Sequence, residues 1–157
     1  MLKIQQRATV SKLIHNWSPT YSALCSQGRV PSPICPRCGS TVETSSHVII
    51  CPHNSAVEQR TVGLNKFLSS VLSLQTPIYL LSTLEYKLSL TLQIPFAQRY
   101  INSFSIPSDI HLTLLTAIHH QNLLGWDLFL RGFVSKYWNE VYIQAHSRSP
   151  SSSSTQI

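Results

Sequence analysis

The sequence is poor in charged side chains. Only 11% of its 157 residues are Asp, Glu, Lys or Arg, whereas about 25% is usual for a soluble domain. Much of the surface must therefore be Ser, Thr, Gln, Asn or exposed apolar groups, which favours contact with a partner. A chain of this length with 43% hydrophobic residues can still bury one core of ordinary size, so a single domain is the first expectation.

The chain also lacks the residue sets of several catalytic classes. Its five glycines never cluster, which excludes a phosphate-cradling loop. Its acids stand singly, and two-metal nuclease or nucleotidyl chemistry requires several converging carboxylates. The six acids are Glu43, Glu58, Glu85, Asp109, Asp127 and Glu140. We therefore expect a protein that is not an enzyme.

No apolar run is long enough to cross a bilayer. The most hydrophobic stretch, residues 110–134, is interrupted by three histidines, Asp127 and Arg131, and a membrane-spanning helix needs about 20 apolar residues. The N-terminal MLKIQQRATVSKL lacks the continuous apolar core of a signal peptide. The sequence thus predicts a soluble intracellular protein, in the nucleus or the cytoplasm, with no membrane partner.

The basic charge is concentrated at the N-terminal end. Residues 1–42 contain five bases and no acid, whereas residues 43–157 contain seven bases and six acids, giving net charges of +5 and +1. The five N-terminal bases are Lys3, Arg7, Lys12, Arg29 and Arg37. Such a concentration favours a polyanion, DNA or RNA, or an acidic protein face; a basic excess that serves only solubility is the alternative.

Three cysteines and a histidine lie in the stretch CPRCGSTVETSSHVIIC, with the spacing Cys-x2-Cys-x8-His-x3-Cys. A Cys-x2-Cys pair can place two thiolates on one ion within a tight turn, and Gly39 gives that turn its conformational freedom. His47 and Cys51 are four residues apart, so they share one face of a helical turn. We therefore predict one structural Zn²⁺ bound by Cys35, Cys38, His47 and Cys51.

Four protein ligands close the coordination shell of zinc, so this ion should organise the fold without activating water. Degenerate cysteines and disulfides are the alternatives, and the intracellular thiol pool argues against disulfides. A catalytic Cys51–His47 pair is geometrically possible, but the other thiols compete for it. His53 could substitute as a ligand. Glu43 could bond a ligand N–H or support the helix that carries His47, or remain a solvated carboxylate, and Cys25 should be a free, half-buried thiol.

Helical periodicity dominates outside the cysteine segment. An apolar stripe predicts a first helix that ends near Trp17, and Ser18-Pro19 should begin a short helix that Gly28 closes. Later patterns predict helices at 55–74, from 77 to about 92 and at about 108–121, and a last helix whose aromatic core seam runs from Trp126 to Val141. The expected fold is mainly α, with a zinc-organised module at 1–53, a bundle of about four helices at 54–146 packed on it, and a disordered Ser-rich tail at 147–157.

The stretch KLIHNWSPTYSALCSQGRVPSPICPRCGSTVETSSHVIICPH, residues 12–53, resembles the zinc-binding domain on the C-terminal side of the polymerase in non-LTR retrotransposon reverse transcriptases. That family's pattern is a helix with a W-x-P-T exit, a short helix ending in Gly, and then C-P-x-C-G, an E-T pair, H and C-P. The matching residues are Trp17, Pro19, Thr20, Cys35, Pro36, Cys38, Gly39, Glu43, Thr44, His47, Cys51 and Pro52. Many members have four residues between the histidine and the last cysteine, where this chain has three. Residues 122–138 show a weaker likeness to the C-terminal tails of such elements.

The resemblance implies a detached C-terminal piece of a retroelement protein that lacks the polymerase. The family's polymerase carries a paired-aspartate metal motif, and this chain contains no Asp-Asp. A piece of this kind cannot polymerise by itself, but it retains the domain thought to help hold nucleic acid near the polymerase.

Two functions follow. The first is a nucleic-acid-binding zinc module whose five N-terminal bases contact phosphates, with a stacking face from Tyr21 or Trp17. The second is a protein-interaction or scaffold module, or a remnant of one, whose zinc is purely structural. In that case the low-charge surface would dock on a reverse transcriptase polypeptide.

Overall fold

The computed structural model describes residues 12, 18–100 and 106–147. These residues form seven helices, α2 to α8, and their strand-like pairing is limited to one antiparallel bridge between Ile34 and Val42. The expectation of a mainly α fold is confirmed. The expected first helix and the Ser-rich tail from residue 148 onward lie outside the described residues. Within the described part of the chain, no helix is both long enough and apolar enough to span a membrane.

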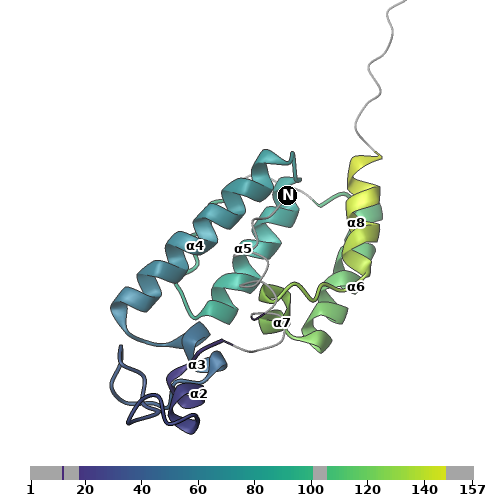
Figure 1. The fold of residues 1–157 in the computed structure, drawn as a ribbon. Helices are drawn as coiled ribbons and strands as arrows, with labels where there is room; N and C mark the ends of the chain where they lie inside the picture. Colours follow the sequence, from purple (N-terminus) through teal and green to yellow (C-terminus); the bar gives the residue numbers. More distant parts are fainter. Residues whose placement is uncertain (1–11, 13–17, 101–105, 148–157) are drawn as a thin grey trace, which may run out of the picture. The chain divides into compact units, whose positions relative to one another are not determined.

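The chain divides into two compact units, residues 1–100 and 101–157. The first contains α2 (Tyr21–Ser26), α3 (Ser45–Ile50), α4 (Asn54–Ser73) and α5 (Ile78–Leu92) (Figure 1). The expected module boundary at residue 53 therefore falls inside the first unit. The reason is physical: α3 packs against α5, so the cysteine segment and the α4–α5 hairpin share one interior.

The short helix α2 begins two residues later than the Ser18-Pro19 pattern predicts. Thr20 is extended, with φ −73° and ψ 156°, and its hydroxyl accepts the backbone N–H of Ala23 at 3.3 Å. Thr20 is therefore the N-cap in place of Ser18. At the other end Gly28 has φ +68° and donates its N–H to the Cys25 carbonyl at 2.9 Å, which confirms the expected glycine closure.

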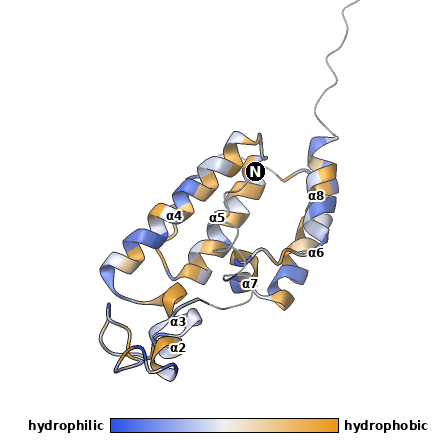
Figure 2. Ribbon diagram, in the orientation of Figure 1, coloured by the Kyte–Doolittle hydropathy of each residue, from blue (hydrophilic) through white to orange (hydrophobic). Residues whose placement is uncertain are grey.

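Helices α4 and α5 lie side by side as a hairpin joined by residues 74–77 (Figure 1). Both carry hydrophobic and hydrophilic residues in alternation along the ribbon (Figure 2). Three of the most deeply buried side chains of these helices are Leu68 on α4 and Leu81 and Leu88 on α5. Their burial stabilises the first unit by about 2 kcal/mol for each fully buried leucine.

The second unit contains α6 (Ser108–Leu124), α7 (Trp126–Leu130) and α8 (Tyr137–His146). The sequence predicts a single last helix from Trp126 to Val141, and this prediction is wrong because residues 131–136 form a turn between α7 and α8. The chain turns at Gly132, whose φ is +93°.

The buried side chain of Gln121 holds this turn in place. Its amide nitrogen donates to the carbonyls of Gly125 at 3.1 Å and Phe133 at 3.3 Å, and its amide oxygen accepts the N–H of Ser135 at 3.0 Å. Gln121 is fully buried, and its bonds to Phe133 and Ser135 satisfy backbone groups in the turn between α7 and α8.

The aromatic seam forms a core despite the break. Trp126 is buried and meets Trp138 edge-on with ring centroids 6.0 Å apart, while Val141 is fully buried. The core prediction is confirmed for Trp126 and Val141. Phe133 lies in the turn and is 46% exposed, because the interruption removes it from the helical face.

The first unit buries one carboxylate, Glu85 on α5. Its side chain is 2% exposed; Oε2 accepts the Arg99 N–H at 3.2 Å, and Oε1 lies 3.8 Å from the half-exposed guanidinium of the same residue. Burial raises the pKa of Glu85, and the backbone and charge of Arg99 only partly oppose that effect. The loop after α5 is thereby fixed to the helix.

Glu85 generates a prediction for the pH dependence of stability. Because its pKa is raised on folding, the folded chain holds this proton more firmly than the unfolded chain. Its charge therefore opposes folding near neutrality, and this effect fades as pH falls toward the ordinary glutamate value of 4.5. Glu85→Gln should unfold at higher denaturant concentration than wild type at about pH 7, with the difference shrinking toward about pH 5. A difference that is constant over this range would contradict the assignment.

Candidate metal centre

The first two thiols lie on a tight turn closed by backbone hydrogen bonds. Gly39 donates to the Cys35 carbonyl at 2.9 Å and has φ +66°, a conformation that favours glycine. The Cys35 N–H in turn donates to the Thr41 carbonyl at 2.8 Å, and Glu43 donates to the Pro33 carbonyl at 2.8 Å. The chain from 33 to 43 is thus a small hairpin that presents Cys35 and Cys38 from its tip.

The other two side chains come from α3 and its end. Thr44 is the N-cap of this helix and accepts the His47 N–H at 3.1 Å. Cys51 is the residue at which the helix ends. One helical turn therefore separates the imidazole from the last thiol, as the spacing predicts.

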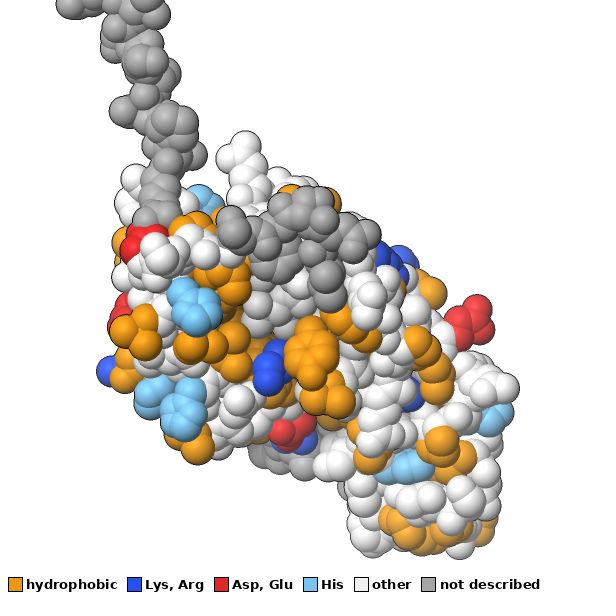
Figure 3. All heavy atoms as spheres, turned by 180° about the vertical axis from the view of Figure 1, so that it is seen from behind, with side chains coloured by type: hydrophobic (Ala, Val, Ile, Leu, Met, Phe, Trp, Pro, Cys, Tyr) orange, Lys and Arg blue, Asp and Glu red, His pale blue; other side chains and the backbone are white. Residues whose placement is uncertain are grey.

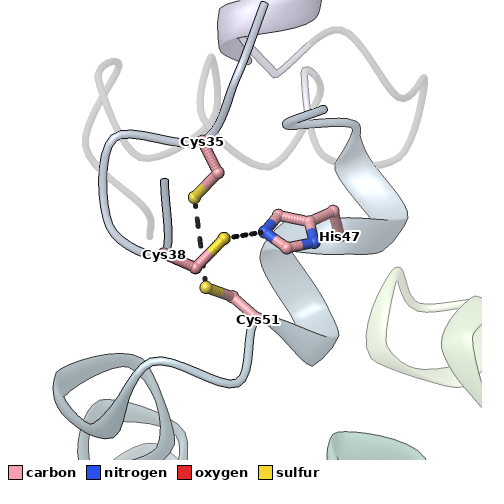
Figure 4. A group of neighbouring side chains, drawn as sticks. All are labelled: Cys35, Cys38, His47 and Cys51. Atoms are coloured by element: carbon pink, nitrogen blue, oxygen red, sulfur yellow. Dashed lines mark hydrogen bonds between the residues drawn. The ribbon is translucent and has the colours of Figure 1, made fainter. Parts of the chain in front are cut away.

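The four side chains converge on one point (Figure 4). Their ligand atoms all lie within 4.8 Å of one another. Cys35 Sγ is 4.0 Å from Cys51 Sγ, and Cys38 Sγ is 3.4 Å from His47 Nε2. A tetrahedral zinc ion with normal bond lengths separates two sulfurs by about 3.8 Å, and a sulfur from a nitrogen by about 3.6 Å. The donors therefore fit a single Zn²⁺, and the chain carries a possible zinc site of three thiolates and an imidazole.

The same distances argue against a disulfide. A disulfide requires sulfurs about 2.05 Å apart, whereas the buried pair Cys35 and Cys51 is separated by 4.0 Å. All four cysteines are free thiols. Four protein donors also complete a tetrahedral shell, so the arrangement suits a structural ion that binds no reacting water.

The thiols differ in their readiness to ionise. The Ser40 hydroxyl is the main cause that lowers the pKa of Cys38 to about 6, with the Ser40 and Thr41 N–H groups assisting. Burial raises the pKa of Cys35, against the opposing N–H groups of Cys38 and Arg37. Zinc binds thiolates, so loading the site must displace any protons that the ligand thiols carry, and the raised pKa of Cys35 makes its proton the harder one to remove.

Glu43 lies next to the cluster, where the sequence suggested it could act. Its carboxylate accepts the Tyr21 N–H in the first turn of α2 at 3.0 Å, and its backbone carbonyl accepts the Ser22 N–H at 3.2 Å. A side-chain hydrogen bond with Glu43 is also among the smaller causes that raise the pKa of Cys35. The carboxylate therefore has a partner in the first turn of α2.

Sequence reasoning missed Arg60. Its guanidinium donates from Nη1 to the carbonyl of Cys51 at 2.9 Å and from Nε to the carbonyl of Leu92 at 3.0 Å. The sequence does contain a pattern that could have indicated this residue. Arg60 lies four residues from both Ala56 and Leu64, on the same face of α4 as the buried residues Ala56, Leu64 and Leu68. A cation on the buried stripe of a helix needs partners inside the fold.

The remaining residues predicted for the site lie outside the four-residue cluster or outside the described residues. Arg29, Arg37 and Lys12 are exposed, and Tyr21 is half-buried. Lys3, Arg7 and Trp17 lie outside the described residues. His53 is exposed, bonds the Ser55 hydroxyl at 2.8 Å and caps α4, so it is separate from the cluster, and Cys25 is free and half-buried as expected.

Zinc should bind at one equivalent, and its removal should disorder residues 31–53, because among the described residues the buried cluster of this segment consists mainly of the ligands Cys35, Cys38 and Cys51. The helical signal of α4 to α8 should largely persist in chelator. Cys38→Ser should reproduce the effect of chelation, and the matched Cys25→Ser variant should bind zinc like wild type. Elemental analysis measures the zinc content, and circular dichroism measures the change in structure. A purified protein that contains no metal and keeps its near-UV signal in chelator would exclude the site.

Glu43→Ala should lower the free energy of unfolding of the zinc-loaded protein by about 1–2 kcal/mol, because the Tyr21 N–H loses its charged acceptor. Glu43→Gln keeps an acceptor oxygen and should lose less. Chemical denaturation in saturating zinc measures both changes. If Glu43→Ala is as stable as wild type, the Glu43 carboxylate is solvated and its bond to Tyr21 does not stabilise the fold.

The residues and their geometry carry the assignment of this centre. Comparisons of the chain with protein-family models, with curated proteins and with solved structures find no match.

Proposed function

We propose that this chain is a non-catalytic structural zinc module that binds nucleic acid non-specifically through its basic N-terminal quarter. The convergence of Cys35, Cys38, His47 and Cys51 within 4.8 Å carries the proposal. A closed shell of this kind stabilises a short, irregular segment that has little core of its own. The function must then come from the surface that the metal organises.

Two arginines connect the metal turn to that surface. Arg37 lies between the two ligands of the hairpin tip, and Arg29 follows the glycine that closes α2, with its N–H on the Leu24 carbonyl at 2.9 Å. Both side chains are exposed. A folded metal site therefore holds two cations on ordered backbone, where phosphates can reach them.

We also propose an origin in the zinc-binding domain of a non-LTR retrotransposon reverse transcriptase. Several residues that carry the resemblance have definite structural roles here. Thr20 caps α2, Gly39 turns the hairpin with positive φ, and Thr44 caps α3. A domain of this origin would have a reverse transcriptase polypeptide as a second candidate partner.

A scaffold function is the alternative, and the composition of the surface favours it. The metal-binding segment exposes the apolar side chains of Val42, Val48 and Ile50 at 40%, 47% and 37%. On the face drawn in Figure 3, uncharged and hydrophobic side chains cover this segment and Lys or Arg side chains are sparse. Such a face suits docking on a protein more than contact with phosphates.

Salt dependence distinguishes the two functions, because phosphate contacts release counterions and apolar docking does not. The zinc-loaded protein should bind fluorescent single-stranded and duplex oligonucleotides of any sequence with weak to moderate affinity that falls steeply with salt. Replacing Arg29 and Arg37 together by Gln should weaken all sequences about equally and reduce the salt slope by up to about two units.

The matched control replaces Lys66 and Lys87, on α4 and α5, by Gln, which removes the same net charge away from the metal turn. This variant should keep the wild-type slope. Absence of binding to every oligonucleotide at low salt, in protein shown to contain zinc, would eliminate the nucleic-acid function and leave the scaffold function.

A further inference from the structure

Arg60 joins the ends of two helices. Cys51, whose carbonyl accepts from Nη1, is the residue at which α3 ends, and Leu92, whose carbonyl accepts from Nε, is the last residue of α5. Carbonyls at helix C-termini lack intrahelical partners and carry partial negative charge. One guanidinium on α4 therefore satisfies both ends and connects the metal segment to the hairpin.

The guanidinium is incompletely satisfied by these contacts. Its third nitrogen, Nη2, is buried and has no hydrogen-bond partner among the described residues. The acids of the described chain do not compensate this charge, because Arg60 forms no ion pair among the described residues. A cation in such a position is unfavourable unless a negative charge lies close to it.

The loaded metal centre supplies such a charge. Three thiolates around one Zn²⁺ leave the centre with a net charge of about −1. Cys51, the ligand whose carbonyl Arg60 binds, has its sulfur in this group and is 2% exposed. The guanidinium of Arg60 and the metal centre therefore both lie beside the buried residue Cys51, where opposite charges attract more strongly than at the surface.

We propose that Arg60 is a positioning residue of the metal centre, which holds the Cys51 backbone and balances the net negative charge of the loaded site. This inference rests on the proposed structural zinc site. It implies that zinc binding stabilises the end of α5 through the bond from Arg60 to Leu92, which lies 32 residues away in sequence.

Arg60→Met and Arg60→Lys in the full chain separate this role from ordinary packing. Methionine keeps an unbranched apolar stem without charge, so the metal-free hairpin should be as stable as wild type or more stable. Zinc affinity, measured by competition with a chromogenic chelator, should nevertheless fall about tenfold or more. Lysine restores the charge but cannot donate to two carbonyls in the geometry of a guanidinium. The zinc affinity of Arg60→Lys should therefore lie between those of Arg60→Met and wild type. Lys66→Met, an exposed position on the same helix, is the matched control and should bind zinc like wild type.

Hydrogen exchange on the wild-type chain gives a second readout that needs no variant. Zinc loading should increase protection of the Gln93 and Ile94 amides, which bond to carbonyls in the last turn of α5. The inference is overturned if Arg60→Met binds zinc within about threefold of wild type, if Arg60→Lys is as weak as Arg60→Met, or if zinc leaves these amides unchanged. Failure of wild type to bind zinc at all would instead reject the proposed metal site itself.

Discussion

The convergence of three thiols and one imidazole is the constraint on which the N-terminal part of the first unit depends. Cys35 and Cys51 are almost completely buried, and among the described residues the core cluster that contains them adds only Ala56 and the partly buried Cys38. A cluster this small cannot hold a hairpin and two six-residue helices in place by apolar burial alone. A shared ion would replace the missing hydrophobic contacts by four bonds whose directions are fixed.

The α4–α5 hairpin has a different source of stability. Leu68, Leu81 and Leu88 pack in its interior, and Glu85 ties the following loop to the helix through Arg99. The two regions therefore differ in what would stabilise them, which is apolar burial in the hairpin and, with an ion bound, coordination in the metal-binding segment. The side chain of Arg60 is where they meet, which explains why a cation occupies a position on α4 whose neighbours along the helix face are apolar.

Local patterns predict the helices and the metal ligands, because both depend on spacings of one to a few residues. Pro77 and Pro107 immediately precede α5 and α6, and the four-residue step from His47 to Cys51 sets two ligands on one turn. The division at residue 100, the break between α7 and α8 and the role of Arg60 escaped prediction, because each depends on contacts between distant residues. Gln121 illustrates the difficulty: the periodicity of its neighbours does not show that its amide will bond the backbone of Phe133 and Ser135 in the turn between α7 and α8.

The reach of the stabilising contacts along the chain has a kinetic consequence. Cys35 meets Cys51 across 16 residues, Tyr21 meets Glu43 across 22, and Arg60 meets Cys51 across 9 and Leu92 across 32. Each contact closes a loop of the 100-residue unit, and the conformational entropy lost on closure grows slowly with loop length. An ion bound to all four ligands would keep the loop from Cys35 to Cys51 closed, so the zinc-loaded unit should unfold more slowly than the metal-free unit.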